Sequence, residues 1–283
     1  MNYNAIDISY VQAGIDPTID PNIEYIVVKA SQKDYKDPQF ENHMRMIGNK
    51  CNVGFYHFLE CHDEKEAVQQ AKIFLNIIAP YSFHCSYVYL DCEVYNIQYM
   101  RNMSKEKLTS VCLAFLNECT KAGYIACLYT NIDHMENRLV KRKIEGNYPI
   151  WIANYSPCMP EYKNILMWQY GAGHVEGYSG MVDLDVHFFS KEEMAIMSLA
   201  RKGFILSPVF WIKHYKKTKW LGLLLIKANS AYRFKWKESK KVEWALEKLF
   251  RDGVINSPTY WESQASKNKN IKQLLLNLGG GVR

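Results

Sequence analysis

The first 190 residues alternate short apolar runs, rich in Val, Ile, Tyr and Phe, with longer stretches in which apolar residues recur every three or four positions. The short runs predict buried strands, and the longer stretches predict helices. The helix predicted over 104–123 begins at Ser104, a residue type that caps helices, and ends before Gly123. The predicted strands are 25–31, 52–58, 86–94, 125–130, 148–155 and 164–170, and the other clear helix is 63–79.

Strand, helix and strand follow one another repeatedly, an order that favours a parallel sheet covered by helices. The length of this region suits a (β/α) barrel, either complete or incomplete. Two further apolar runs, around Asp7 and around Asp183, are the expected first and last strands. We therefore predict an α/β fold, an irregular (β/α) barrel, over residues 1–190.

Residues 191–283 contain an internal repeat with an offset of 50 positions. Residues 193–228 align with 243–278 without a gap, and so many identities at one offset indicate a duplicated unit. Each unit predicts a helix ended by Gly, a turn of the form G-x-I-x-S-P, and a second helix that begins near the Ser-Pro. We therefore predict a small all-α domain of two helical hairpins. Matching pairs include Gly203 and Gly253, Ile205 and Ile255, Ser207 and Ser257, Pro208 and Pro258, and Trp211 and Trp261.

Charge divides the chain at the same boundary. Residues 1–190 carry 16 Lys and Arg against 22 Asp and Glu, a net −6, whereas residues 191–283 carry 19 against 7, a net +12. A basic domain attracts polyanions. The linking stretch 228–241 interleaves cations with Tyr232, Phe234 and Trp236, whose rings can stack on sugars or bases, and a solvated basic face is an equal alternative. Trp211 and Trp261 are predicted core residues.

Several kinds of protein are disfavoured. The eight cysteines form no C-x-x-C pair and several lie in apolar runs, so buried thiols are favoured over disulfides or a metal site. The N-terminus lacks the pattern of a signal peptide, and the longest apolar stretch, 220–226, is too short to span a bilayer. We expect a chain made in the cytoplasm, with no membrane partner. No nucleotide-binding loop, nucleophile elbow or zinc helix occurs, so neither a metal nor a cofactor is expected.

Acidic residues mark the ends of several predicted strands. Asp91 and Glu93 lie two apart at the end of one apolar run, so on a strand both would project from the same face. Asp7 and Asp183 lie at the ends of the expected first and last strands, which a closed barrel brings together. A solvated strand end is the alternative for any single acid. Four together favour a catalytic pocket, because clustered carboxylates raise one another's pKa and keep one protonated as a general acid.

Aromatic residues accompany these acids at or near strand ends. Core packing accounts for about half of such rings. The others would suit a sugar-binding cleft, because the apolar face of a pyranose stacks on a ring while acids meet its hydroxyl groups. The residues are Tyr56, Tyr129, Trp151, Tyr155, Trp168 and Tyr170.

Seven motifs in order give residues 3–189 a resemblance to the glycoside hydrolase family 25 lysozymes. No motif is specific alone, but together they cover the whole domain. The resemblance implies an irregular β/α barrel that hydrolyses the β-1,4 bond between N-acetylmuramic acid and N-acetylglucosamine in bacterial peptidoglycan. The motifs are DISYVQ (7–12), IVVKAS (26–31), VGFYHF (53–58), LDCEV (90–94), WIANY (151–155), WQYG (168–171) and GMVDLDVHF (180–188).

The resemblance also implies roles for individual residues. Glu93 would be the general acid that protonates the leaving oxygen. Asp91 would orient the substrate's own acetamido group, whose oxygen attacks the anomeric carbon, and a direct nucleophilic carboxylate stays open. Asp7 and Asp183 would hold the hydrogen bonds and charge balance of the pocket. The implied substrate-binding residues are Tyr56, Tyr129, Trp151, Tyr155, Gln169 and Lys29.

Two places depart from the family pattern. Gln32 and Lys33 stand where the family commonly has Glu and Gly, and Asp185 stands where it usually has Asn. Neither change removes a proposed catalytic acid. Because of both changes, the substrate subsites and the pH optimum are not expected to follow the family pattern.

The repeated units of 193–278 are similar to short G-x-I-x-S-P-x-Y-W helical units at the ends of cell-wall hydrolases from clostridia and their phages. The whole chain therefore resembles a phage endolysin that reaches the cell wall after release, and a bacterial autolysin is the alternative. The expected partners are peptidoglycan and anionic wall polymers such as teichoic acid, and nucleic acid is disfavoured. The tail is also a candidate surface for a homo-oligomer.

Two other functions stay open. One is a non-catalytic wall-binding protein built on a decayed barrel, which the retention of all four acids disfavours. The other is a barrel hydrolase of another N-acetylated polysaccharide, such as chitin.

Overall fold

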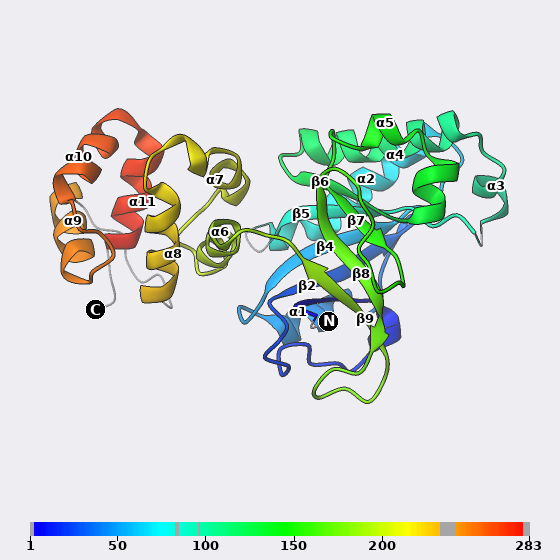
Figure 1. Cartoon of the computed structure of the whole chain (residues 1–283), viewed down its shortest axis with the longest axis horizontal. Helices are drawn as coiled ribbons and strands as arrows, with labels where there is room; N and C mark the ends of the chain where they lie inside the picture. The colour runs from blue at the N-terminus through cyan, green and yellow to red at the C-terminus, as the bar shows by residue number, and fades with distance from the viewer. Residues whose placement is uncertain (1–2, 83–84, 96, 233–240, 280–283) are drawn as a thin grey trace. The chain divides into compact units, whose positions relative to one another are not determined.

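The chain folds into two units, Met1–Phe188 and Phe189–Arg283, in a computed structural model that describes residues 3–82, 85–95, 97–232 and 241–279 (Figure 1). Each unit has its own apolar core. Two of the rings predicted to stack on sugars or bases, Phe234 and Trp236, lie outside the described residues.

Eight strands of the first unit close into a barrel in the order β1-β9-β8-β7-β6-β5-β4-β2, because β1 also pairs with β2. A short ninth strand, β3, extends β2 as a hairpin. The strands are β1 (Ala5–Ile8), β2 (Tyr25–Gln32), β3 (Tyr35–Lys36), β4 (Asn52–Phe58), β5 (Cys85–Asp91), β6 (Ile125–Asn131), β7 (Ile150–Ala153), β8 (Ile165–Gly173) and β9 (Val182–His187).

Most neighbouring strands of the barrel run parallel, as the alternation of strand and helix predicts. The exception is β9, which is antiparallel to both β8 and β1. A parallel pair needs a long crossover, whereas an antiparallel pair can be joined by a short loop. The predicted irregular (β/α) barrel is confirmed, and this reversed strand is its irregularity.

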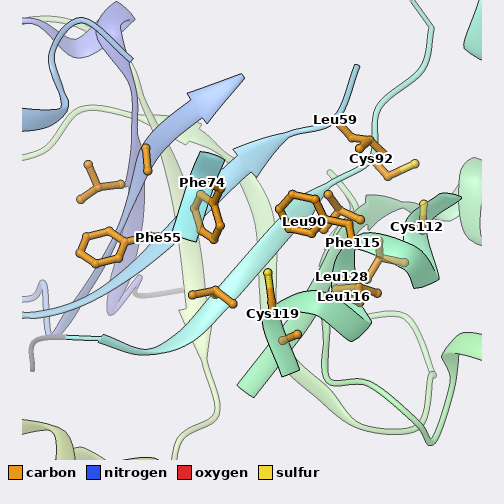
Figure 2. Close-up of a cluster of buried hydrophobic side chains, with 14 of the residues drawn as sticks. Phe55, Leu59, Phe74, Leu90, Cys92, Cys112, Phe115, Leu116, Cys119 and Leu128 are labelled. Carbon is orange, nitrogen blue, oxygen red and sulfur yellow. The ribbon is translucent and has the colours of Figure 1, made fainter. Parts of the chain in front are cut away.

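Helices pack on the outside of the barrel. Asp63 and Ser104 cap α2 and α4 by accepting hydrogen bonds from backbone N–H groups of their first turns. Apolar residues that alternate along the strands face these helices, as Leu90 and Leu128 face Phe74 and Phe115 in Figure 2. The helices of this unit are α1 (Phe40–Ile47), α2 (Glu64–Ile78), α3 (Gln98–Arg101), α4 (Lys105–Lys121) and α5 (Lys141–Ile144).

The barrel interior is filled by the other set of strand residues, among which large aromatic rings dominate. Tyr25, Tyr89 and Trp151 are fully buried there. The Tyr89 and Trp151 rings meet edge to face, with centroids 5.4 Å apart. These rings fill the barrel interior and form the floor of the site. Polar side chains gather above them at one end of the barrel.

The second unit consists of helices in two similar halves. In each half the predicted hairpin is followed by a third helix, which packs against the first. The helices are α6 (Lys191–Arg201), α7 (Pro208–His214) and α8 (Leu221–Ala231) in the first half, and α9 (Val242–Arg251), α10 (Pro258–Lys267) and α11 (Lys269–Gly279) in the second.

The turn between the first two helices has the same geometry in both halves. Gly203 and Gly253 have φ values of 79° and 70°, a left-handed conformation that favours glycine. The residue after each glycine donates its backbone N–H to Leu199 or Leu249, at 2.8 and 2.9 Å. The repeat in the sequence is therefore also a repeat in the backbone.

Other expectations can be placed on this fold. Trp211 and Trp261 are buried in the core of the second unit, as predicted. Seven of the eight cysteines are buried, and Cys158 is exposed. In the described part of the chain, no helix is both long and apolar enough to cross a membrane.

Candidate active site

The predicted acids gather at the barrel rim formed by the carboxyl ends of the parallel strands. Asp91 is the last residue of β5, and Glu93 lies two residues beyond it. The prediction that both acids project from one strand is therefore wrong, because the strand ends between them. Their charges still interact directly.

Asp7 and Asp183 face each other across the seam between β1 and β9, where they are direct partners in the register. Asp183 was predicted at the end of the last strand, and it is instead the second residue of β9. Since β9 runs antiparallel, its amino end lies at the same rim as the carboxyl ends of the parallel strands. The acid therefore reaches the predicted rim from the opposite end of its strand.

A chain of hydrogen bonds connects this pair to the neighbouring strands. The Gln169 amide donates to Asp7 Oδ2 at 2.9 Å, and its oxygen accepts from the Tyr129 hydroxyl at 2.9 Å. The Tyr155 hydroxyl lies 3.2 Å from the same amide oxygen and 3.4 Å from Asp183 Oδ1. Gln169 is thus held in one orientation, with its N–H directed at Asp7.

A fifth acid, Asp185, lies beneath the rim. It is fully buried, and it accepts a hydrogen bond of 2.7 Å from the Trp151 indole N–H. Its other oxygen, Oδ2, is buried, and its carboxyl group shares a hydrogen bond with Asp7 that requires a proton on one of the two acids. An ionised carboxylate is poorly satisfied by this environment.

The pKa values of all five acids are raised. Burial is the largest cause for each of them. The charge of Asp183 adds to the rise in the pKa of Asp7, and the charge of Glu93 adds to that of Asp91. A hydrogen bond with Asn131 partly offsets the rise in the pKa of Glu93. Such a cluster holds protons at a pH where isolated carboxylates have lost them.

Lys29 is the predicted cation of this pocket, and it is buried on β2. Its ammonium donates to Gln32 Oε1 at 2.9 Å and lies 5.0 Å from the centre of the Phe58 ring. Burial lowers the pKa of Lys29, whereas the charge of Asp91 raises it. Lys33, which stands where the family commonly has Gly, has φ 52°. Glycine adopts this conformation more readily than lysine.

The predicted substrate-binding residues occupy two levels. Tyr56, Tyr129 and Gln169 are buried at the floor of the rim, while Tyr155 is 63% exposed and can contact a substrate directly. Trp151 is only 1% exposed and is covered by the floor tyrosines. Its ring therefore lies beneath the site, and its predicted contact with a sugar stays a prediction.

The model for glycosyl hydrolases family 25 matches residues 6–178. The chain belongs to this family. The matched region covers most of the barrel and includes Asp7, Asp91 and Glu93. Family membership confirms the predicted enzyme class, a glycoside hydrolase of the lysozyme type.

Solved structures of family 25 relatives share the fold. The CTP1L endolysin is 27% identical, with a TM-score of 0.56 over 71% of this chain and 70% of its own. The bacterial lysozyme from Streptomyces coelicolor is 21% identical, with a TM-score of 0.59 over 71% of this chain and 98% of its own. A comparison with curated proteins gives no significant match.

The modular autolysin LytC from Streptococcus pneumoniae, solved with a synthetic peptidoglycan ligand, also shares the fold. It is 18% identical, with a TM-score of 0.59 over 66% of this chain. The match spans 46% of LytC, so the chain covers less than half the length of that relative.

Two residues of the family 25 site were given no role from the sequence. Asn131 ends β6 and hydrogen-bonds Glu93, and Asp185 shares the interior of the barrel with Asp7. Asn131 directly follows the predicted strand 125–130, and a polar residue at the end of an apolar run is the signal that marked Asp91. Asp185 was noticed only as a departure, although its i, i+2 spacing from Asp183 on one strand indicates a shared face.

Proposed function

We propose that the chain is an endolysin that hydrolyses the β-1,4 bond between N-acetylmuramic acid and N-acetylglucosamine. It would act on peptidoglycan after release from the cell in which it is made. The observation that carries this proposal is the cluster of acids with raised pKa values at the rim of a family 25 barrel. The likeness to the CTP1L endolysin and to LytC with its peptidoglycan ligand supports the same substrate.

Glu93 is the proposed general acid. It is half-buried at the rim, and burial together with the charge of Asp183 raises its pKa, so it holds its proton nearer to neutral pH than a free glutamate. This proton passes to the glycosidic oxygen as the bond to the anomeric carbon breaks. The Asn131 side chain holds the carboxyl group in place.

Asp91 is the proposed partner of the substrate's acetamido group. It is buried beside Glu93 and opposite the cationic Lys29, which favours its ionised form, while Glu93 favours the protonated one. Mutual repulsion between the two acids favours a state in which the pair retains one proton. With that proton on Glu93, the Asp91 carboxylate can accept the acetamido N–H and orient the acetamido oxygen toward the anomeric carbon.

Asp7, Gln169 and Tyr129 form the proposed supporting network. The hydrogen bonds of Gln169 fix the position of Asp7, and the exposed Tyr155 ring above them offers a surface for a pyranose. The network would act by positioning the substrate before proton transfer.

The direct test compares wild type with Glu93→Gln on purified clostridial cell walls. The substitution keeps the shape of the side chain and removes its acid, so loss of turbidity should slow by a factor of about 100 or more. Released sugars are identified by mass spectrometry, and fragments that end in reducing N-acetylmuramic acid are expected.

Glu106→Gln, at an exposed position of α4, is the matched control and should clear walls like wild type. Clearing by Glu93→Gln at the wild-type rate would contradict the role of Glu93. Hydrolysis of chitin but not of walls would indicate another N-acetylated substrate. Wild type that clears neither polymer but sediments with walls would indicate a binding protein.

The second unit is proposed to hold the enzyme on the wall. Its sequence carries the net +12, and the described lysines 213, 216, 217 and 219 are part of that charge. Cell walls carry carboxylates and phosphates, which a basic domain attracts at moderate ionic strength. Co-sedimentation of Glu93→Gln with intact walls, which are then not digested, tests this part separately.

A further inference from the structure

Two cavities in the second unit are related by the same offset of 50 residues that relates its halves. The ten residues that line one cavity are 204–207, 210, 211, 270, 273, 274 and 277. Those that line the other are 254–257, 260, 261, 220, 223, 224 and 227. Each position in one corresponds to a position in the other, and the volumes are ≈ 290 and ≈ 300 Å³.

Each cavity is built from both halves. The first, here the Trp211 pocket, lies between the Ser-Pro turn of the first half and helix α11 of the second. The second, here the Trp261 pocket, lies between the Ser-Pro turn of the second half and helix α8 of the first. Neither half alone forms a complete pocket. Both copies of the repeat are therefore needed to form either one.

Hydrogen bonds between the halves hold both pockets open at a defined width. The Asn277 amide donates to the Phe204 carbonyl at 3.0 Å beside the Trp211 pocket. The Tyr260 hydroxyl donates to the Lys219 carbonyl at 2.8 Å beside the Trp261 pocket. These contacts are made by pocket-lining side chains, so the pockets belong to the packed structure of the unit.

The lining of the Trp261 pocket combines rings with polar groups. Trp220, Tyr260 and Trp261 supply aromatic surfaces, and Asn256, Ser257 and Lys227 supply hydrogen-bonding groups. A cavity of this size, with apolar walls and a few fixed polar groups, suits a small ligand. The rings suit the C–H face of a pyranose, and the polar groups suit its hydroxyl and acetamido substituents.

The charge around this pocket favours an acidic saccharide over a neutral one. Lys227 lines it, and the Lys219 ammonium lies 5.1 Å from the centre of the Trp220 ring. The Trp211 pocket has the amides of Asn270 and Gln273 at the positions of Trp220 and Leu223. Leu206 and Asn277 also take the places of Asn256 and Lys227, so the Trp211 pocket has no cation among its described lining residues and its acidic ligand should bind more weakly.

Trp220 is the most informative residue of the set. Its ring is 57% exposed, and its backbone has φ 66°, a conformation that is unfavourable for a side chain of this size. Strain of this kind persists where the surrounding structure holds the residue and often accompanies a binding role. A glycine at this position would remove the ring and suit the backbone.

We propose that the second unit carries two quasi-equivalent sites for an acidic amino-sugar saccharide, the chemistry of a glycan strand whose N-acetylmuramic acid carboxylates carry no peptide. The inference rests on the proposed function, since it names the sites through which the unit holds the wall. Two sites on one polymer give an avidity well above the affinity of either. Moderate affinity at each site then suffices for retention.

The test uses the full chain carrying Glu93→Gln and the soluble disaccharide N-acetylglucosaminyl-N-acetylmuramic acid, titrated by calorimetry. Trp220→Gly should lower the number of disaccharides bound per chain by one, because it removes an aromatic wall of the Trp261 pocket. Any binding in the barrel is unchanged. Trp244→Ala is the matched control: Trp244 is 60% exposed in the same unit and lines neither pocket. It should leave the number unchanged.

Adding Gln273→Glu to Trp220→Gly places a negative charge in the Trp211 pocket, which should remove the second site. The double variant should bind intact walls at least about tenfold more weakly, because avidity is lost. Chitobiose, which has no carboxylate, should bind several-fold more weakly than the acidic disaccharide. Circular dichroism of the Trp220→Gly variant should match wild type, so that a change in the number of disaccharides bound reports the site and not a loss of fold.

Stoichiometry unchanged by Trp220→Gly would overturn the proposal. Equal affinity for chitobiose and the acidic disaccharide would overturn the acidic ligand. If the pocket variants lose binding to polyglycerol phosphate but keep binding to the disaccharide, the ligand is a teichoic acid instead. If the Glu93→Gln chain fails to sediment with walls at all, the targeting role in the proposed function fails. If it sediments and the pocket variants sediment equally, only the two sites fail.

Discussion

At the scale of single residues, the site is a balance among carboxyl groups that cannot all ionise. Asp185 is the most deeply placed of them, and its pKa is raised first by burial and then by the charge of Asp7. A family 25 chain usually has Asn here, so this chain carries one more titrating group in the same space. Its presence should make the stability of the barrel more sensitive to pH.

Asp185→Asn should stabilise the protein at pH 7. A raised pKa means that the folded state keeps a proton that the unfolded state has lost, so the contribution of Asp185 is favourable at low pH and lost as pH rises through the folded pKa. Asn does not titrate, and its oxygen can still accept from Trp151. The gain at pH 7 should be on the order of 1 kcal/mol, and it should shrink toward pH 4.

Denaturant unfolding at both pH values measures this gain. Asp34→Asn, at an exposed position, is the control and should change stability little at either pH. Equal gains from Asp185→Asn at pH 4 and pH 7 would show that Asp185 does not titrate as argued.

At the scale of elements, the local pattern predicts the strands well and their long-range relations less well. The run 52–58 coincides with β4, and 25–31 with all but the last residue of β2. The antiparallel direction of β9 and the end of β5 before Glu93 depend on pairing with distant strands, which local hydrophobicity does not record. The repeat alignment already matched Leu224 with Leu274, but the third helix of each unit, α8 or α11, was not predicted as a separate element.

The barrel interior gives a test of packing at this scale. A methyl group on Gly54 of β4 would lie 2.3 Å from the Tyr25 hydroxyl and 2.7 Å from the Tyr89 ring. Gly54→Ala should therefore destabilise the protein by about 1–3 kcal/mol, because the buried Tyr25 and Tyr89 rings have no space to move away from the added methyl group. Thermal unfolding measures the change.

Gly171→Ala on β8 is the matched control, because a methyl group there would meet nothing within 4 Å. It should unfold near the wild-type temperature. Equal unfolding temperatures for the two variants would mean that the rings beneath the site can move apart, contrary to a rigid floor.

At the scale of the whole molecule, the family 25 barrel and the helical unit differ in charge as well as in structure. Residues 1–190 carry a net −6, and residues 191–283 carry a net +12. The acidic part contains the catalytic rim, and the basic part is the one proposed to meet the anionic wall. The chain thus separates two electrostatic tasks that would oppose each other within one domain.

This separation predicts different responses to salt. Raising NaCl from 0.05 to 0.5 M shortens the Debye length from about 14 Å to about 4 Å, which weakens attraction between the basic unit and the wall. Retention of the Glu93→Gln chain on walls should therefore fall severalfold. Hydrolysis of a short soluble glycan by wild type should change little, because proton transfer within the barrel involves buried groups that salt screens poorly.

Co-sedimentation of the Glu93→Gln chain measures retention, and mass spectrometry of the products of wild type measures hydrolysis, in the same series of buffers. Parallel losses in both would mean that salt acts on the fold or on the catalytic rim. Retention that is insensitive to salt would assign the wall contact to the aromatic pockets alone. The Trp220→Gly variant distinguishes these cases, because a purely charge-driven contact would retain its salt response after the ring is removed.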